Sequence, residues 1–453
     1  MRKMANRKWW YRPVVVAAIA GLLFLPAASP AEPIWDPKDL PAAVRMVLGE
    51  VGDLINQEKY AAAVDKLLAF EARGRSAEAR GGAPQAVYSH PMIHFALGNA
   101  YLLQESYAPA RQAFERAVER HPAWVPAWLN LAKAHYELEA PAEAARCFFT
   151  AYENGGRQNA EHLYLSAAAH LMDRQYSASV ARFEQLLDRH PDQMHSEWRE
   201  HLVHALLSDD QPRRALPHIR RLAHTYEGDK RIQWQEILLH QYMHLEMHAD
   251  ALALARALVE QAPTLAKWWK AKAHLHLNAQ DYEPALTAMI VYGFLAPLSR
   301  NERQLLADLH LQVGTPGQAA PLYESILQAE GADKRVLTNL VTALRQIGRP
   351  DAALEQLERH SDSRHDPDLL MLRADLLYGL ERYADAADAY RLAAEGNSRQ
   401  AGQAWLMAGY AAWQIEDWRA SHRAFERAAE FERQRQPALT AMRRLAQQPA
   451  RAN

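Results

Sequence analysis

A small residue recurs every 33 to 36 positions along most of this chain, and this spacing limits the possible fold more than any other feature. In nine of the ten cases a bulky apolar residue follows four positions later, as Phe114 follows Ala110. Residues four apart share one face of an α-helix, so each unit predicts a helix that packs through this face. A period of this length is typical of stacked helical repeats. The ten small residues are Ala110, Ala144, Ser179, Ala215, Ala251, Ala285, Ala319, Ala353, Ala386 and Ser421.

The segment 94–122 shows one unit in full. It predicts two helices, a turn between them and a proline that ends the unit. We expect Gly98 to allow the paired helices to approach closely, and the aromatic side chains to fill the space between them. The residues of this unit that fit a common pattern are Leu97, Gly98, Tyr101, Ala110, Phe114, Ala117 and Pro122.

This pattern resembles the tetratricopeptide repeat, in which W-x2-L-G-x2-Y is followed by A-x3-F and P over 34 residues. Only the first aromatic residue differs, because His94 stands in its place. The resemblance implies an all-α helix-turn-helix solenoid, a right-handed superhelix of about ten repeats with an N-terminal degenerate pair and a C-terminal capping helix. The expected parts are a signal peptide at 1–31, an extended arm and degenerate pair at 32–70, a flexible link at 71–89, the solenoid at 90–432, and the capping helix and tail at 433–453.

The first 31 residues have the layout of an export signal. A positive end with five basic residues precedes the apolar run from Val14 to Leu25, and Ser29 and Ala31 provide a small-x-small cleavage site. The run is short for a membrane span, which favours cleavage after Ala31 over retention as an anchor. We therefore expect a periplasmic protein with no membrane span after cleavage.

Charge and cysteine content exclude some classes of function. After residue 31 the chain carries 47 basic and 54 acidic residues, a net charge of −7, which gives no reason to expect a nucleic acid partner. The single cysteine, Cys147, cannot form an internal disulfide, and its position beside Phe148 predicts a small buried apolar residue.

No motif of a catalytic or cofactor site is present, so we expect neither an enzyme nor a bound cofactor. One arrangement could bind metal, because His240, His244 and His248 are spaced four apart in a predicted helix. The alternative is that histidine is a core filler here, since four histidines occupy the place of Tyr101 in later units: His135, His170, His276 and His310. Asp308 and Asp375 should project from first helices, but single acids on separate turns do not form an acid/base pair.

Function is then expected on the surface that the first helices form. In tetratricopeptide repeat proteins these helices line a groove that takes a helix or peptide of a partner, and aromatic and methionine side chains suit such contacts. Some of the same positions could instead serve packing between repeats. The predicted groove residues are Met92, Phe95, Asn99, Leu102, Leu129, Lys133, Tyr136, Tyr164, Leu171, Met172, His240, Met243, His244, Lys267, Lys270, His274, Tyr410 and Trp413.

One variant of the family can be tested by residue. Repeats that grip the carboxylate tails of chaperones use lysines, asparagines and an arginine on three successive pairs. Asn99 and Asn130 match the asparagines, but Phe95 replaces the first lysine, and Glu161 and Leu165 replace the last basic residues. The sequence therefore does not predict recognition of an acidic C-terminus.

The order of the parts resembles the tetratricopeptide proteins found alongside TonB systems in proteobacteria. The similarity lies in the export signal, the degenerate pair near 44–68, the link and the repeats that follow. It implies a periplasmic scaffold that contacts TonB, ExbB or ExbD. The alternatives are a scaffold for another envelope assembly, for polysaccharide export or for secretion, a metal-binding protein that uses the histidine face, and self-assembly through exposed solenoid faces.

Overall fold

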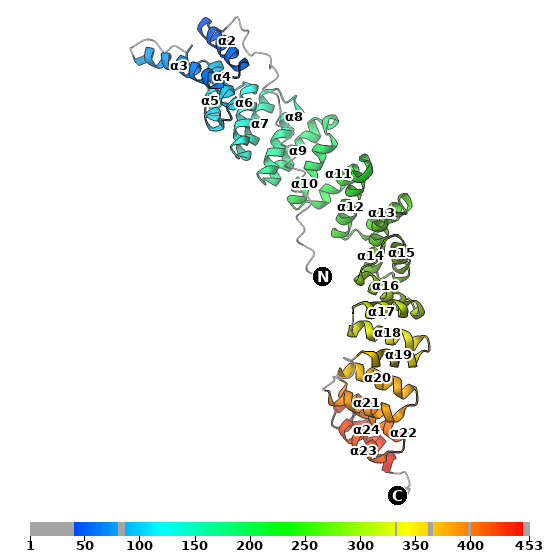
Figure 1. Cartoon of the computed structure of the whole chain (residues 1–453). Helices are drawn as coiled ribbons and strands as arrows, with labels where there is room; N and C mark the ends of the chain where they lie inside the picture. The colour runs from blue at the N-terminus through cyan, green and yellow to red at the C-terminus, as the bar shows by residue number, and fades with distance from the viewer. Residues whose placement is uncertain (1–39, 80–86, 331–332, 361–365, 397–399, 447–453) are drawn as a thin grey trace. The chain divides into compact units, whose positions relative to one another are not determined.

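The computed structural model describes residues 40–79, 87–330, 333–360, 366–396 and 400–446. Every regular element in these ranges is a helix, and the chain divides into two compact units, Met1–Glu246 and Met247–Asn453 (Figure 1). The expected signal peptide at 1–31 and the extended arm at 32–38 lie outside the described residues. The division falls in the turn of the fifth repeat pair, where the repeat spacing continues without interruption.

The described residues of the first unit form eleven α-helices and one short 3-10 helix. They are α2 (Ala42–Asn56), α3 (Tyr60–Ala79), α4 (Pro91–Leu103), α5 (Tyr107–Arg120), α6 (Val125–Glu137), α7 (Pro141–Asn154), α8 (Ala160–Met172), α9 (Tyr176–Arg189), η1 (Pro191–Gln193), α10 (Ser196–Ser208), α11 (Pro212–Thr225) and α12 (Gly228–His244).

In the part of the second unit that the structure describes there are twelve α-helices. They are α13 (His248–Gln261), α14 (Ala266–Asn278), α15 (Tyr282–Leu295), α16 (Arg300–Gln312), α17 (Pro316–Glu330), α18 (Lys334–Gln346), α19 (Pro350–Arg359), α20 (Pro367–Gly379), α21 (Tyr383–Glu395), α22 (Ala401–Gln414), α23 (Trp418–Ala429) and α24 (Glu432–Ala446).

The predicted periodicity is confirmed by burial. All ten recurring small residues have 0% exposure and lie in the second helix of a pair, from Ala110 in α5 to Ser421 in α23. Two of them are serines, and each hydroxyl donates to a first-helix carbonyl twelve residues earlier. Ser179 Oγ lies 2.8 Å from Ala167 O, and Ser421 Oγ lies 2.9 Å from Gly409 O. The serines thus replace alanine without leaving a buried hydroxyl unpaired.

Close approach of the paired helices depends on glycine where we expected it. A Cβ atom added at Gly98 would lie 2.5 Å from the ring of Phe114, and one at Gly409 would lie 2.4 Å from Phe425. Both rings are fully buried. The aromatic ring therefore fills the space that a side chain at the glycine would take.

The turn within each pair has one conformation throughout. Its middle residue, five positions before the buried small residue, has φ between +56° and +82° in all ten pairs. Glycine fills this position only at Gly314 and Gly348, while Glu105, Glu139 and other charged or polar residues fill it elsewhere. The left-handed conformation costs an L-residue about 1–2 kcal/mol, so these turns are stabilised by the packing of the helices they join.

The degenerate N-terminal pair has the geometry of a true repeat. Glu58 has φ +58°, and Ala63 and Leu67 are fully buried, as in the later pairs. The expected link at 71–89 begins later than predicted, because α3 continues to Ala79. Phe70 and Tyr88 hold the two ends of this segment together, with ring centroids 4.9 Å apart.

The C-terminal helix covers the last pair. Helix α24 begins at Glu432, next to the predicted boundary at 433, and contains Pro437. Ala438 and Ala441 are its buried residues and join a cluster with Phe425, while Met442 packs at the edge of that cluster. Pro437 is the sixth residue of α24, so it removes one backbone hydrogen bond that an N–H at this position would donate within the helix.

Candidate protein-interaction surfaces

The predicted groove residues fall into three classes of exposure. The half-buried ones are Met92, Phe95, Asn99, Leu102, Leu129, Lys133, Tyr136, Met172, Lys270, Tyr410 and Trp413. The exposed ones are His240, Met243, His244, Lys267 and His274. The buried ones are Tyr164 and Leu171.

Tyr164 is therefore a core residue and not part of a groove. It is 1% exposed, its ring stacks on Trp198 at 4.4 Å, and its hydroxyl is hydrogen-bonded to His201 Nδ1 at 2.9 Å. Leu171 is 3% exposed and equally unavailable. Tyr164 joins successive repeats, because Trp198 and His201 belong to the first helix of the next pair.

Phe95 also serves packing between repeats. Its ring lies 4.4 Å from that of Trp124, just before α6, and 5.8 Å from that of Phe114. Beside it, Asn130 Nδ2 donates to Asn99 Oδ1 at 2.7 Å and links α6 to α4. The two asparagines that match a carboxylate clamp therefore bond to each other.

What remains open on α4, α6 and α8 is a set of half-buried apolar side chains with one cation. Leu102 and Met172 lie near the ends of α4 and α8, and Leu129, Lys133 and Tyr136 lie on α6. Burial, and then the neighbouring Glu137, raise the pKa of Tyr136, so its hydroxyl stays protonated and can donate a hydrogen bond. We call these five residues the early first-helix face.

The histidine arrangement does not form the metal site that the spacing suggested. Helix α12 ends at His244, and Glu246 has φ +57°, so His248 begins the next helix and does not share a face with His240. His240 and His244 stack with centroids 6.4 Å apart. Among the described residues no three His, Cys, Asp or Glu side chains gather to hold a metal ion.

Several other histidines are core residues, as the alternative interpretation held. His135, His170 and His276 are 4–9% exposed and occupy the place of Tyr101 in their units. Cys147 is 6% exposed, and burial raises the pKa of its thiol to about 12, which leaves it protonated and unreactive.

Charged side chains on successive first helices of the second unit form ion pairs. Lys270 Nζ lies 2.6 Å from Glu302, which belongs to the next first helix, and similar pairs continue from α16 to α18 and from α18 to α20. Burial alone would raise the pKa of Glu302, but hydrogen bonds from Lys270 and Ser299 outweigh it and hold the pKa at about 2. Lys270 is therefore paired with Glu302 within the protein, whereas the sequence predicted it as a residue of the partner-binding groove.

Asp308 and Asp375 are likewise structural. The hydroxyl of Tyr323 donates to Asp308 at 2.6 Å, and that of Tyr390 donates to Asp375 at 2.7 Å. Each bond joins the two helices of one pair, so neither acid is a free catalytic group.

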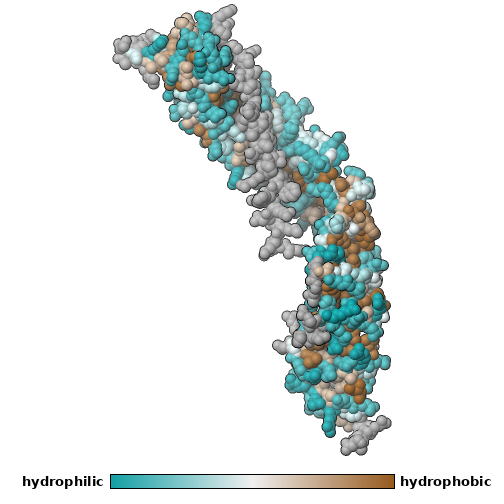
Figure 2. All heavy atoms as spheres, in the orientation of Figure 1, coloured by the Kyte–Doolittle hydropathy of each residue, from teal (hydrophilic) through white to brown (hydrophobic). Residues whose placement is uncertain are grey.

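An exposed apolar surface on the second helices was not predicted from the sequence. Figure 2 shows hydrophobic side chains gathered over α13 to α15. Phe294, near the end of α15, is 85% exposed, the highest value for a large hydrophobic residue in the described part of the chain, and Leu295 beside it is 38% exposed. The signal was present in the sequence, because no charged residue occurs between Glu283 and Arg300.

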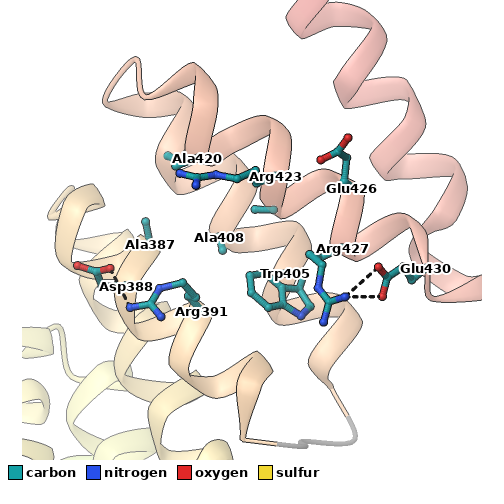
Figure 3. Close-up of a pocket in the computed structure, with 12 residues that line it drawn as sticks. Ala387, Asp388, Arg391, Trp405, Ala408, Ala420, Arg423, Glu426, Arg427 and Glu430 are labelled. Carbon is teal, nitrogen blue, oxygen red and sulfur yellow. Dashed lines mark hydrogen bonds and ion pairs between the residues drawn. The ribbon is translucent and has the colours of Figure 1, made fainter.

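A depression of about 800 Å³ lies between α21 and α23, with α22 beneath it (Figure 3). Trp405 lines it, and the guanidinium of Arg427 lies 5.7 Å from the centre of its ring. Arg427 also pairs with Glu430 at 2.9 Å, and Arg391 pairs with Asp388 at 3.5 Å. The cations on its rim are largely neutralised, so the depression is a concave surface with little net charge.

An equivalent depression of about 490 Å³ lies between α5 and α7 in the first unit. Its tryptophan, Trp128, occupies the same place in its repeat as Trp405, and its indole Nε1 donates to Pro122 O at 2.7 Å. Trp269 makes the same bond to Pro263 O at 2.8 Å. Trp128 and Trp269 occupy the position of the first aromatic residue of the pattern, which is His94 in the first unit. Their indole hydrogen bonds join the start of each helix to the proline that ends the preceding unit.

The described helices include none that is long and apolar enough to cross a membrane.

Comparison with known proteins agrees with this architecture. Models described as tetratricopeptide repeat match residues 48–123, 91–157 and 310–376. The two units are thus α-helical solenoids built from helix pairs. The repeats are tetratricopeptide repeats, and the fold is a tetratricopeptide-repeat solenoid. No curated protein matches the sequence significantly.

Solved structures with similar helical repeats share little sequence with the chain. A structure of Naa15/Naa10 bound to HypK-THB has 14% identity over 88% of this chain and 71% of that one, with a TM-score of 0.34. Yeast Tom70 has 14% identity over 89% and 95%, with a TM-score of 0.29. YrrB, described as a TPR protein with an unusual peptide-binding site, has 19% identity over 45% and 98%, with a TM-score of 0.31.

Proposed function

We propose that this protein is an exported scaffold that binds a helix or extended segment of an envelope protein on its early first-helix face. The observation that carries the proposal is the set of half-buried Leu102, Leu129, Tyr136 and Met172 on three successive first helices. Apolar and aromatic side chains on such a face supply the anchor contacts of helix and peptide recognition. Lys133 among them favours a segment that carries an acidic or carbonyl group opposite it.

The proposed location is the periplasm, and the proposed partner is TonB, ExbB or ExbD. The support is the sequence: a positive end, an apolar run and a small-x-small site precede the repeats, and the order of parts resembles that of TonB-associated repeat proteins. If the signal is cleaved as proposed, mass spectrometry of the protein from the periplasmic fraction will show an N-terminus at Glu32. A chain that keeps residues 1–31 would argue for an anchored form instead.

The binding proposal is tested by affinity purification of the tagged chain from crosslinked cell envelopes. The test variant carries Leu102→Ser, Tyr136→Ser and Met172→Ser, which spare the packing residues Phe95 and Tyr164. A matched control, Leu392→Ser, changes an exposed apolar residue on α21 in the second unit. Circular dichroism establishes that all variants are folded.

Recovery of TonB, ExbB or ExbD with the native chain and the control, and at least a tenfold loss with the triple variant, would support both the partner and the surface. Recovery of a different envelope machine would replace the TonB assignment with the alternative of another assembly, export or secretion scaffold. Equal recovery with the folded triple variant would rule out the early first-helix face as the binding site.

A further inference from the structure

Helix α10 carries a buried arginine at a place where three other first helices carry tryptophan. Two of these, Trp128 and Trp405, stand sixteen positions before the recurring small residue of their pairs, and each lines a depression between two second helices. Figure 3 shows this arrangement around Trp405. The residue sixteen positions before Ala215 is Arg199, which is only 6% exposed. By this alignment, a buried positive charge faces the space between the second helices α9 and α11.

The guanidinium of Arg199 has no acidic partner among the described residues. Its Nη1 donates to His218 Nδ1 at 3.0 Å, and the acceptor is a neutral imidazole. Arg303, the arginine at the same place in the seventh pair, is half-buried and donates instead to a backbone oxygen, that of Leu298, at 3.0 Å. Burial, and then the neighbouring Arg221, lower the pKa of Arg199, and no carboxylate opposes this shift. Because an arginine stays charged and a buried charge without a counter-ion is costly, this residue favours an anion that the described chain does not supply.

Arg221 on α11 adds a second positive charge without a counter-ion. It stands six positions after the recurring small residue of its pair, where Arg427 stands in the tenth pair. Arg427 pairs with Glu430 at 2.9 Å, but the residue of the fourth pair that corresponds to Glu430 is His224. Arg221 is exposed, and within the part of the chain that the structure describes its side chain forms no ion pair. The fourth pair therefore keeps the arginine and lacks the acid that neutralises it in the tenth.

His218 provides a hydrogen-bond donor beside the two arginines. A guanidinium only donates, so His218 Nδ1 is the acceptor from Arg199, and the neutral imidazole carries its proton on Nε2. Burial lowers the pKa of His218 to about 4, and three nearby arginines add to this shift, Arg199 most and then Arg221 and Arg214. Arg214 pairs with Glu184 of α9, so the net charge of the group is the +2 of Arg199 and Arg221. His218 and Arg221 are three residues apart on α11 and share one side of that helix.

From these observations we propose that Arg199, His218 and Arg221 bind a phosphate group. A phosphate group carries a charge of about −1.5 to −2 at pH 7, which matches the two arginines, and its oxygens accept the hydrogen bonds that guanidinium groups and an imidazole N–H donate. A carboxylate would neutralise only one of the two arginines. The site shares no residue with the early first-helix face, so it does not depend on the function proposed for that face.

The experiment titrates the purified full chain with inorganic phosphate at pH 7.5 by isothermal calorimetry, at a constant ionic strength of about 0.15 M. Arg199→Met and Arg221→Met are the test variants, because methionine is a long side chain without charge. Arg221 is exposed, so its substitution leaves the fold intact even if that of buried Arg199 does not. Arg256→Met is the matched control, since Arg256 is an exposed arginine on α13, the second helix of the next pair.

We expect saturable binding with a Kd below about 1 mM for the native chain and Arg256→Met. Each test variant should bind at least about tenfold more weakly, because each removes one charge and its hydrogen bonds. Bound phosphate should also raise the pKa of His218 from about 4, as measured by NMR of the imidazole, since a neighbouring anion favours the charged ring. The proposal is wrong if binding does not saturate or if folded Arg221→Met binds phosphate as the native chain does.

Two further ligands identify the class and the source of the anion. Acetate should bind at least about tenfold more weakly than phosphate, and an equal affinity would overturn the proposal in favour of a carboxylate of a partner protein. Phosphoserine is a small phosphate monoester and distinguishes the two sources of a phosphate group. An affinity equal to that of inorganic phosphate supports a site for a phosphate carried on a larger molecule, and a weaker one supports a site for free phosphate.

Discussion

The buried histidine of α10 makes the first unit sensitive to mild acid. His201 is 3% exposed, its Nδ1 lies 2.9 Å from the hydroxyl of Tyr164, and its ring stacks on the same tyrosine. Burial lowers the pKa of His201 to about 4; the nearby Glu200 opposes this shift and His204 adds to it. The imidazole is therefore neutral in the folded protein at pH 5 and charged in the unfolded chain, whose histidine pKa is about 6.5.

The direction of the pH dependence follows from proton binding. A histidine whose pKa is lower in the folded state binds fewer protons there, so stability is lost as pH falls from 6.5 toward 4 and is unaffected above 6.5. With pKa values of 6.5 and about 4, the free energy of unfolding should fall by about 2 kcal/mol between pH 7.5 and pH 5 through this one residue.

Urea unfolding followed by circular dichroism at pH 7.5 and pH 5 measures this loss. His201→Gln keeps a polar side chain but cannot titrate, so its loss of stability should be smaller than that of the native chain by about 2 kcal/mol. His224→Gln, at an exposed position on α11, is the control and should behave as the native chain does. Equal losses for the native chain and His201→Gln would refute the argument that burial keeps this imidazole neutral.

Three further predictions concern packing, turns and charge. Gly98→Ala places a methyl group against the buried ring of Phe114 and should lower the free energy of unfolding by about 1–3 kcal/mol in urea titrations. Glu139→Gly removes the strain of a left-handed turn residue and should raise the free energy of unfolding by about 0.5–1 kcal/mol in urea titrations; a fall would contradict the assigned strain. Lys270→Met should raise the pKa of Glu302 from about 2 toward its ordinary value, and carbon NMR of the carboxyl group measures this change. The stability that the ionised carboxylate supplies would then be lost at a higher pH than in the native chain as acid is added.

The sequence was sufficient to predict the architecture because the same spacing recurs in ten units of the chain. Each recurring alanine or serine has to fit against the first helix of its pair, and this requirement is visible as spacing without any structure. The conformation of the turns was not predicted. Glutamate at Glu105 and Glu139 gives no sign of a left-handed residue, because the strain is supported by the packed helices and not by local preference.

The predicted groove was less accurate, for a physical reason. Phe95 and Tyr164 occupy the same place in their units as groove residues of the family, but the fate of each ring depends on a neighbour about thirty residues away. Trp124 and Trp198 cover them, and nothing in the spacing reveals that contact. Likewise, α12 ended before His248, because the turn of the fifth pair falls between His244 and that residue.

The outer face of the second helices shows what a single sequence can still reveal. Aligning the units by their recurring small residue compares the same position many times within one chain. Low charge on this side is shared by several second helices, since α17 carries Pro321, Ser325 and Gln328 where α23 and its C-cap carry Arg423, Arg427 and Glu430. Phe294 is therefore an exception by its exposure of 85% and not by the low charge around it, although any single exposed apolar residue would be unremarkable on a protein surface.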